Sequence, residues 1–226
     1  MIRLGGNDVR ASLLVAICGV TVALSAQESF SPAQLQSGAT PALPVMAVGG
    51  GEVLLELSIG NDGRVTDVKP LRTTPPFTET LTRAVRDWRF RPAEDARAPV
   101  ASTVLVAGLF RPPALNMPTL GEAPKAGPLA SEETAFPLTM APPLFPPLAN
   151  RGGVVVLEAH VDRGGRTDEI KVLRSASPFD DAARRAVADW IFRPTRIRGG
   201  YVPSLVYVVL GFAAPVSMGA PAGTLQ

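Results

Sequence analysis

The second half of the chain contains a stretch in which apolar and polar residues alternate with a period of two. This pattern predicts a strand with one buried face, formed by Val155, Leu157, Ala159 and Val161, which alternate with Val156, Glu158, His160 and Asp162 on the other face. Gly165 then supplies the glycine of a tight hairpin, so a second strand should return antiparallel over residues 166–174.

The pattern after this hairpin changes to a helical period. One apolar stripe at i, i+4, i+7, i+8 and i+11 predicts a helix that packs one side on the sheet, through Phe179, Ala183, Ala186, Val187 and Trp190. Pro194 disfavours helix at Arg193, so the chain should run extended into a last strand over residues 202–212, which is rich in Val and Leu.

The whole pattern occurs twice, at a constant shift of 102 residues and without a gap. The shift places Gly63-Arg64 on Gly165-Arg166, Pro76-Phe77 on Pro178-Phe179, Trp88-x-Phe90-Arg91-Pro92 on Trp190-x-Phe192-Arg193-Pro194, and Phe110 on Phe212. The chain therefore carries two copies of one unit, and each copy is predicted to be strand, strand, helix, strand. The expected fold class is α+β, with a helix packed on an antiparallel sheet in each copy.

Proline marks the region between the copies. Residues 112–147 hold ten prolines, too many for a helix or a sheet interior, and this segment is predicted to be a linker. The predicted domains are residues 39–111 and 148–213, and residues 214–226, rich in small residues and breakers, form a predicted flexible tail.

The amino terminus has the layout of a secretory signal peptide. Arg3 and Arg10 precede an apolar run that ends in small residues at Ser25 and Ala26, and cleavage there would leave a mature chain without Cys18, the only cysteine. The alternative is that residues 1–26 remain as a short membrane anchor. The run is shorter than the roughly 20 apolar residues that span a bilayer, so the sequence favours cleavage.

Composition excludes several function classes. A net charge of +2 gives no dense basic surface for phosphates, so a nucleic-acid partner is not predicted. A lone cysteine forms neither an internal disulfide nor a zinc cluster. The single histidine, His160, lacks the partners of a Ser-His-Asp site, so no enzyme activity and no cofactor are expected.

These motifs resemble the TonB carboxy-terminal domain. The likeness extends over about 60 residues in each copy and is most specific at Trp88-Arg-Phe-Arg-Pro92 and Trp190-Ile-Phe-Arg-Pro194. It implies a periplasmic location, with a tether to the inner membrane if the amino-terminal segment is retained. The expected partners are an outer-membrane TonB-dependent receptor or another envelope protein, and a second copy of the chain. A family transducer carries a histidine in its membrane segment, whereas the apolar run here has none.

The resemblance also implies where a partner would bind. In the family, the last strand receives a short receptor peptide, the TonB box, by adding it at a sheet edge. The positions carried over are Val202, Ser204, Leu205, Val206, Tyr207, Val208 and Val209. The second candidate strand contains Val100, Ser102, Thr103, Val104 and Val106.

Other conspicuous residues are expected to be structural. Trp88, Trp190 and the phenylalanines at 77, 90, 179 and 192 should pack in the core. Glu158, His160 and Asp162 form a row that could be drawn as metal ligands, but a solvated polar face accounts for it and no metal is predicted. Arg91 and Arg193 are expected to be surface charges.

Two functions therefore follow from the sequence. The first is a TonB-like periplasmic protein that binds a receptor or peptide segment by edge-strand addition, in transport across the outer membrane. The alternative is a structural or interaction module whose two domains pair with each other and which transduces no energy. The position of the last strands, free or paired, distinguishes the two.

Overall fold

The computed structural model describes residues 30–44, 49–111, 132–147 and 149–214. The predicted signal segment, residues 1–26, and nearly all of the predicted tail lie outside the described residues. Within the described part, no helix is long and apolar enough to cross a bilayer.

A six-stranded sheet forms the centre of the molecule, and both repeats contribute to it. The first repeat supplies β2 (Gly51–Ile59), β3 (Val65–Arg72) and β7 (Ser102–Arg111), and the second supplies β9 (Gly153–Val161), β10 (Thr167–Arg174) and β14 (Ser204–Phe212). Their order across the sheet is β10-β9-β14-β7-β2-β3. The predicted sequence of strand, strand, helix, strand is confirmed in both repeats.

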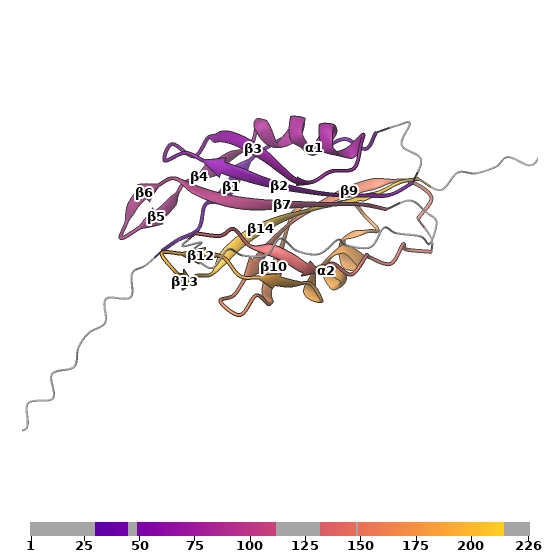
Figure 1. Ribbon diagram of the computed structural model, residues 1–226. Helices are drawn as coiled ribbons and strands as arrows, with labels where there is room; N and C mark the ends of the chain where they lie inside the picture. Colours follow the sequence, from indigo (N-terminus) through magenta and orange to yellow (C-terminus); the bar gives the residue numbers. More distant parts are fainter. Residues whose placement is uncertain (1–29, 45–48, 112–131, 148, 215–226) are drawn as a thin grey trace, which may run out of the picture.

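The two helices cover opposite faces of this sheet. Helix α1 (Phe77–Arg86) packs on β2 and β3, and α2 (Asp180–Ala188) packs on β9 and β10. Figure 1 shows α1 above the sheet and α2 below it. The molecule therefore has three layers, helix, sheet and helix.

Eight short strands lie outside the central sheet. They pair into two-stranded ribbons: β1 (Gln34–Ser37) with β4 (Arg89–Arg91), β5 (Ala93–Asp95) with β6 (Ala98–Val100), β8 (Phe136–Thr139) with β11 (Ile191–Arg193), and β12 (Arg196–Ile197) with β13 (Gly200–Tyr201). Each ribbon in the first repeat has its counterpart 102 residues later, so the internal symmetry extends to segments in which the sequences differ.

The amino-terminal arms of the repeats lie outside the predicted domain boundaries. β1 precedes residue 39, and β8 lies inside the predicted linker, where Pro137 is accommodated because β8 pairs only with β11. The stretch from residue 132 onward is thus part of the second repeat. The rest of the predicted linker, residues 112–131, is outside the described residues.

Both arms are held by the tryptophan of their repeat. The Trp88 indole N–H donates to the Ala39 carbonyl at 3.0 Å, and the Trp190 indole N–H donates to the Ala141 carbonyl at 2.9 Å. Both rings are buried. The prediction of core positions for the two tryptophans is confirmed, and each satisfies its one donor within its own repeat.

The same symmetry appears where helix and last strand meet. Phe77 stacks on Phe110 with ring centroids 4.5 Å apart, and Phe179 stacks on Phe212 at 4.3 Å. These pairs lie in two separate cores, one under each helix. The predicted core positions of Phe77, Phe90, Phe179 and Phe192 are confirmed by their burial.

The hairpin glycines provide a test of this packing. Gly165 has φ of +81°, and a Cβ built there would lie 1.9 Å from the Phe192 carbonyl oxygen. Gly199 has a similar φ of +79°, but nothing lies within 4 Å of its Cβ position.

We therefore expect Gly165→Ala to destabilise the protein far more than Gly199→Ala. Gly199→Ala, the control, should lose only the free energy needed to place an alanine in the left-handed backbone conformation, about 1–2 kcal/mol. Gly165→Ala must in addition displace the backbone at Phe192, which we expect to raise the loss to roughly 3 kcal/mol or more. Urea unfolding of the two variants gives the comparison, and equal losses would contradict the packing described here.

Candidate interaction site: the paired closing strands

The candidate binding strands lie side by side in the middle of the sheet. β14 pairs antiparallel with β9 over its full length and parallel with β7 from Val206–Leu105 to Phe212–Arg111. β7 is likewise paired on its other side with β2. The expectation that these strands lie at a free sheet edge is wrong for the structure, because each repeat closes on the last strand of the other.

This contact follows a two-fold relation whose axis runs parallel to the strands. A rotation about such an axis keeps the strand direction and reverses the faces of the sheet. It therefore produces a parallel pair of last strands and puts α1 and α2 on opposite faces. Both features are present (Figure 1).

The register obeys the same constraint. Residues directly opposite each other in a parallel pair point to one face, whereas equivalent residues of the two repeats must point to opposite faces. Equivalents therefore cannot be direct partners. Val206 is opposite Leu105, one position beyond its equivalent Val104.

The consequence is that both closing strands are buried on both faces. On β14, alternate residues enter the core under α2 or the core under α1, and β7 divides its side chains in the same way. The core under α2 receives Val206, Val208, Leu210, Leu105, Ala107 and Leu109. The core under α1 receives Tyr207, Val209, Val104 and Val106.

Tyr207 is the main departure from two-fold symmetry. Its equivalent in β7 is the aliphatic Leu105, which enters the core of the second repeat. Tyr207 enters the core of the first repeat and is fully buried. Its ring makes edge contacts with Trp88 and Phe90, with centroids 6.1 Å and 5.5 Å apart. A residue of the second repeat thus completes the aromatic cluster of the first.

The Tyr207 hydroxyl ties three segments together. It accepts from the Leu35 backbone N–H at 2.7 Å, and it lies 3.2 Å from both the Ala33 carbonyl and the Glu158 carboxylate, either of which can accept its proton. Burial, reinforced by the Glu158 charge, raises the pKa of Tyr207 far above its usual value. The hydroxyl therefore remains protonated and can donate at any ordinary pH.

The polar row on β9 serves three separate purposes. Glu158 is buried against Tyr207, which corrects the expectation of a solvated face there. The His160 Nδ1 contacts Asp168, and Asp162 accepts backbone N–H groups of Gly164 and Arg166, both at 2.8 Å. The described residues contain no group of three His, Cys, Asp or Glu side chains that could hold a metal.

Of the two arginines in the repeated motif, Arg91 is exposed as expected, and Arg193 differs from expectation. Arg91 donates to the Gln34 side chain at 2.9 Å, near the surface. Arg193 is mostly buried. Its guanidinium lies 5.6 Å from the Phe136 ring centroid and 2.8 Å from a Glu133 oxygen, so it fastens the arm of the second repeat to β11.

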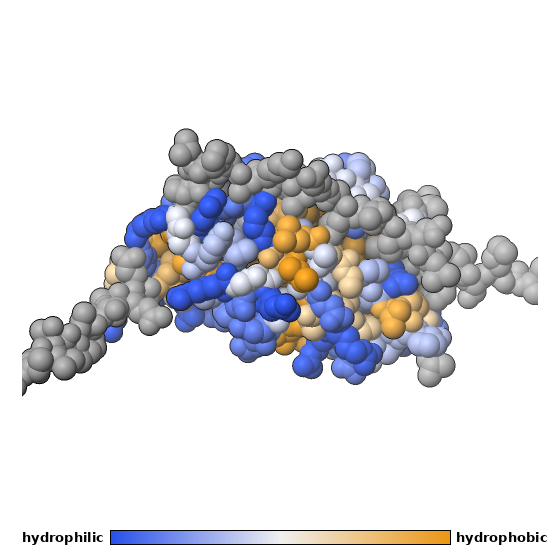
Figure 2. All heavy atoms as spheres, turned by 60° about the horizontal axis from the view of Figure 1, so that its bottom comes forward, coloured by the Kyte–Doolittle hydropathy of each residue, from blue (hydrophilic) through white to orange (hydrophobic). Residues whose placement is uncertain are grey.

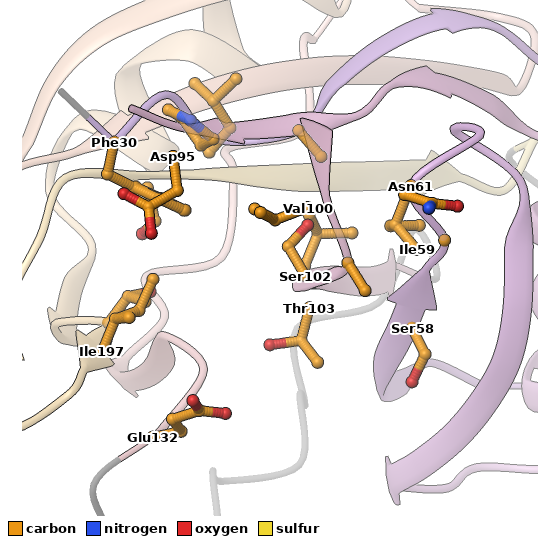
Figure 3. A pocket seen from close by; sticks show the side chains of 18 of the residues that line it. Phe30, Ser58, Ile59, Asn61, Asp95, Val100, Ser102, Thr103, Glu132 and Ile197 are labelled. Atoms are coloured by element: carbon orange, nitrogen blue, oxygen red, sulfur yellow. The ribbon is translucent and has the colours of Figure 1, made fainter. Parts of the chain in front are cut away.

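A groove opens where the closing strands begin. β7 and β14 pair only from Leu105 and Val206 onward, so Ser102–Val104 and Ser204–Leu205 have no sheet partner across the gap. The groove there has a volume of about 760 Å³. Figure 3 shows Phe30, Asp95, Ser102, Thr103, Glu132 and Ile197 arranged around the opening.

One face of the molecule can be followed in a space-filling view. The face that carries α2 shows charged and polar side chains around smaller apolar areas (Figure 2). The large apolar side chains exposed in the described region are Leu138, Leu144, Ile191 and Tyr201, all from the second repeat.

Sequence comparison agrees with this architecture. The family model for the Gram-negative bacterial TonB protein C-terminal matches residues 46–112 and 142–209, which is more than half of the chain and one match for each repeat. The chain belongs to the TonB C-terminal family. Membership supports a TonB-like role in transport at the cell envelope, and an envelope protein as partner.

Among solved structures, a solution NMR structure of the Pseudomonas aeruginosa TonB C-terminal domain is similar to part of this TonB-family chain. The two are 28% identical, and the match covers 38% of this chain and 90% of the other, with a TM-score of 0.29. No curated protein sequence matches the chain.

The central position of Tyr207 gives a testable prediction. Tyr207→Phe keeps the ring but leaves the Leu35 N–H without its acceptor in a buried site, so we expect a loss of about 1–3 kcal/mol in the free energy of unfolding. Tyr201→Phe is the matched control, because Tyr201 is 54% exposed, and it should change stability by less than about 0.5 kcal/mol. Denaturant unfolding measures both, and a neutral Tyr207→Phe would show that the hydroxyl contacts do not hold the repeats together.

Proposed function

We propose that this TonB-family protein is a closed interaction module of the bacterial envelope. Its two domains use their last strands to bind each other, and the module binds its partner in envelope transport without lending a free last strand to a receptor peptide. It carries no catalytic role in this proposal. The observation that supports it best is the parallel pairing of β14 with β7.

Energetics also favour the closed arrangement. Opening the β7–β14 contact would expose apolar residues on both faces of two strands, at roughly 25 cal/mol for each Å² of apolar surface. It would also separate Tyr207 from the Trp88 and Phe90 cluster and from the arm of the first repeat. A receptor peptide of a few residues would have to replace all of these contacts.

A second candidate function is peptide capture after opening. Family membership favours it, together with the somewhat lower stability of parallel pairing per residue. The receiving residues would be those predicted from the sequence, which lie on β14 and β7 except for Val202, just before β14, and Val100, the last residue of β6. In this second function, the paired arrangement of β7 and β14 is the resting state, and a receptor peptide replaces one of the two strands. A tether to the inner membrane through residues 1–26 would belong to this second function.

A disulfide between the two strands distinguishes the candidates. Ala107 and Val208 are direct partners in the parallel ladder, and opposite residues of neighbouring strands have Cα separations within the range that a disulfide spans. The cross-link is made as Ala107→Cys with Val208→Cys, in a chain where Cys18 is replaced by Ser. The single variant Ala107→Cys is the control.

We expect the oxidised and reduced proteins to behave alike toward receptor plug peptides, with no binding in either state to the part of β14 that is paired with β7, residues 206–212. NMR titration of the amides of residues 206–212 gives the readout. Binding that appears in the reduced protein and disappears on oxidation would overturn the closed module and support capture after opening.

A further inference from the structure

We propose that the groove at the start of β7 and β14 is a binding site for an extended peptide segment of a partner protein, which enters as a short strand between the two repeats. This inference rests on the proposed function, since it needs the last strands to remain paired beyond the groove. It places the partner at the junction of the repeats, in a site that a single domain does not possess.

Continuity with the inter-repeat contact is the first argument. β7 and β14 are both full strands at this end, held on their outer sides by β2 and β9 as far as Ser102 and Ser204. Successive residues of a strand direct their N–H and C=O groups to opposite sides. One residue of the pair Thr103 and Val104 therefore directs its backbone N–H and C=O groups into the groove. The same holds for one residue of the pair Ser204 and Leu205. A peptide strand provides the partners that these groups have farther along the sheet.

Two equivalent hydroxyls give the second argument. Ser102 and Ser204 are related by the 102-residue shift, and both line the groove. Their Oγ atoms are buried and have no hydrogen-bond partner among the described residues, and Ser204 is only 9% exposed. An unsatisfied buried hydroxyl costs stability. Because equivalent residues of the two repeats point to opposite faces of the sheet, each hydroxyl can bond to a different amide of a peptide strand that lies between β7 and β14.

The walls set the chemistry of the peptide. Apolar side chains from both repeats, including Ile59, Val100, Ile197 and Leu205, suit small or β-branched side chains. Three acidic residues line the groove, and two of them form ion pairs, Asp95 with Arg198 and Glu133 with Arg193 and Arg196. The third, Glu132, lies at the opening (Figure 3). Arg198 and Asp95 lie 2.7 Å apart and join the two hairpin tips at the rim. Glu132 therefore favours a peptide that places a Lys or Arg beside it.

The test uses a defined probe and the cross-linked protein. The probe is an acetylated and amidated heptapeptide, Lys-Ser-Thr-Val-Thr-Val-Lys. Two further peptides serve as controls, one with alternate backbone amides methylated and one with Glu in place of Lys. The Ala107→Cys/Val208→Cys disulfide keeps the strands from separating, so binding to this protein reports on the groove alone and does not depend on whether the repeats open.

We expect the probe to shift the amide resonances of Thr103, Val104, Ser204 and Leu205 in a saturable way, and the methylated and acidic peptides to bind at least tenfold more weakly. Ser102→Ala with Ser204→Ala should weaken binding about tenfold by removing two hydrogen bonds. The thermal midpoint of this variant should stay equal or rise, because the free protein loses two unsatisfied hydroxyls.

Thr82→Ala is the matched control variant. The Thr82 hydroxyl is also buried and without a partner among the described residues, but it lies on α1, away from the groove. Its replacement should leave peptide affinity within twofold. The proposal is overturned if the probe shifts no groove amide at millimolar concentration, if the methylated peptide binds equally well, or if Thr82→Ala and the double serine variant lose affinity to the same extent.

Discussion

The structure depends on one contact, the parallel pairing of two equivalent strands. A small domain with strand, strand, helix, strand leaves its last strand at a sheet edge with unpaired backbone groups. Two copies in one chain can resolve this by pairing those edges. Because the pairing is parallel, the symmetry axis runs along the strands and the faces of the sheet reverse between repeats. The opposite placement of α1 and α2, the offset of one residue in the register and the burial of both strands on both faces all follow.

The two repeats differ at one position of their contact, and this difference makes the contact specific. Tyr207 replaces the aliphatic side chain found at the equivalent position, Leu105, and joins the Trp88 cluster of the other repeat. Its hydroxyl also binds the arm that Trp88 holds through Ala39. The contact between repeats is therefore coupled to the fold of the first repeat. At the same end of the contact, the β7–β14 ladder stops at Val206 and leaves the groove lined by Ser102 and Ser204.

Much of the fold could be predicted from the sequence because it is encoded locally and twice. Periodicity located both helices and the six long strands, and the Trp and Phe positions of the core followed from the same stripes. The arms β1 and β8 could not be found in this way, since each is four residues long and has no periodic signal. The pairing of β14 with β7 also escaped prediction, although the near-continuous apolar run at 205–210 is typical of a strand buried on both faces. Receptor-peptide binding by these strands remains a prediction.

Hydrogen exchange of the β14 amides tests the central contact most directly. Alternate amides of residues 206–210 point toward β9 and toward β7, so the two sets report separately on the repeat's own sheet and on the contact between repeats. If the repeats are joined as described, both sets exchange only through global unfolding, with equal protection. Protection of the set facing β9, combined with rapid exchange of the set facing β7, would show that the repeats separate in solution and would contradict this account.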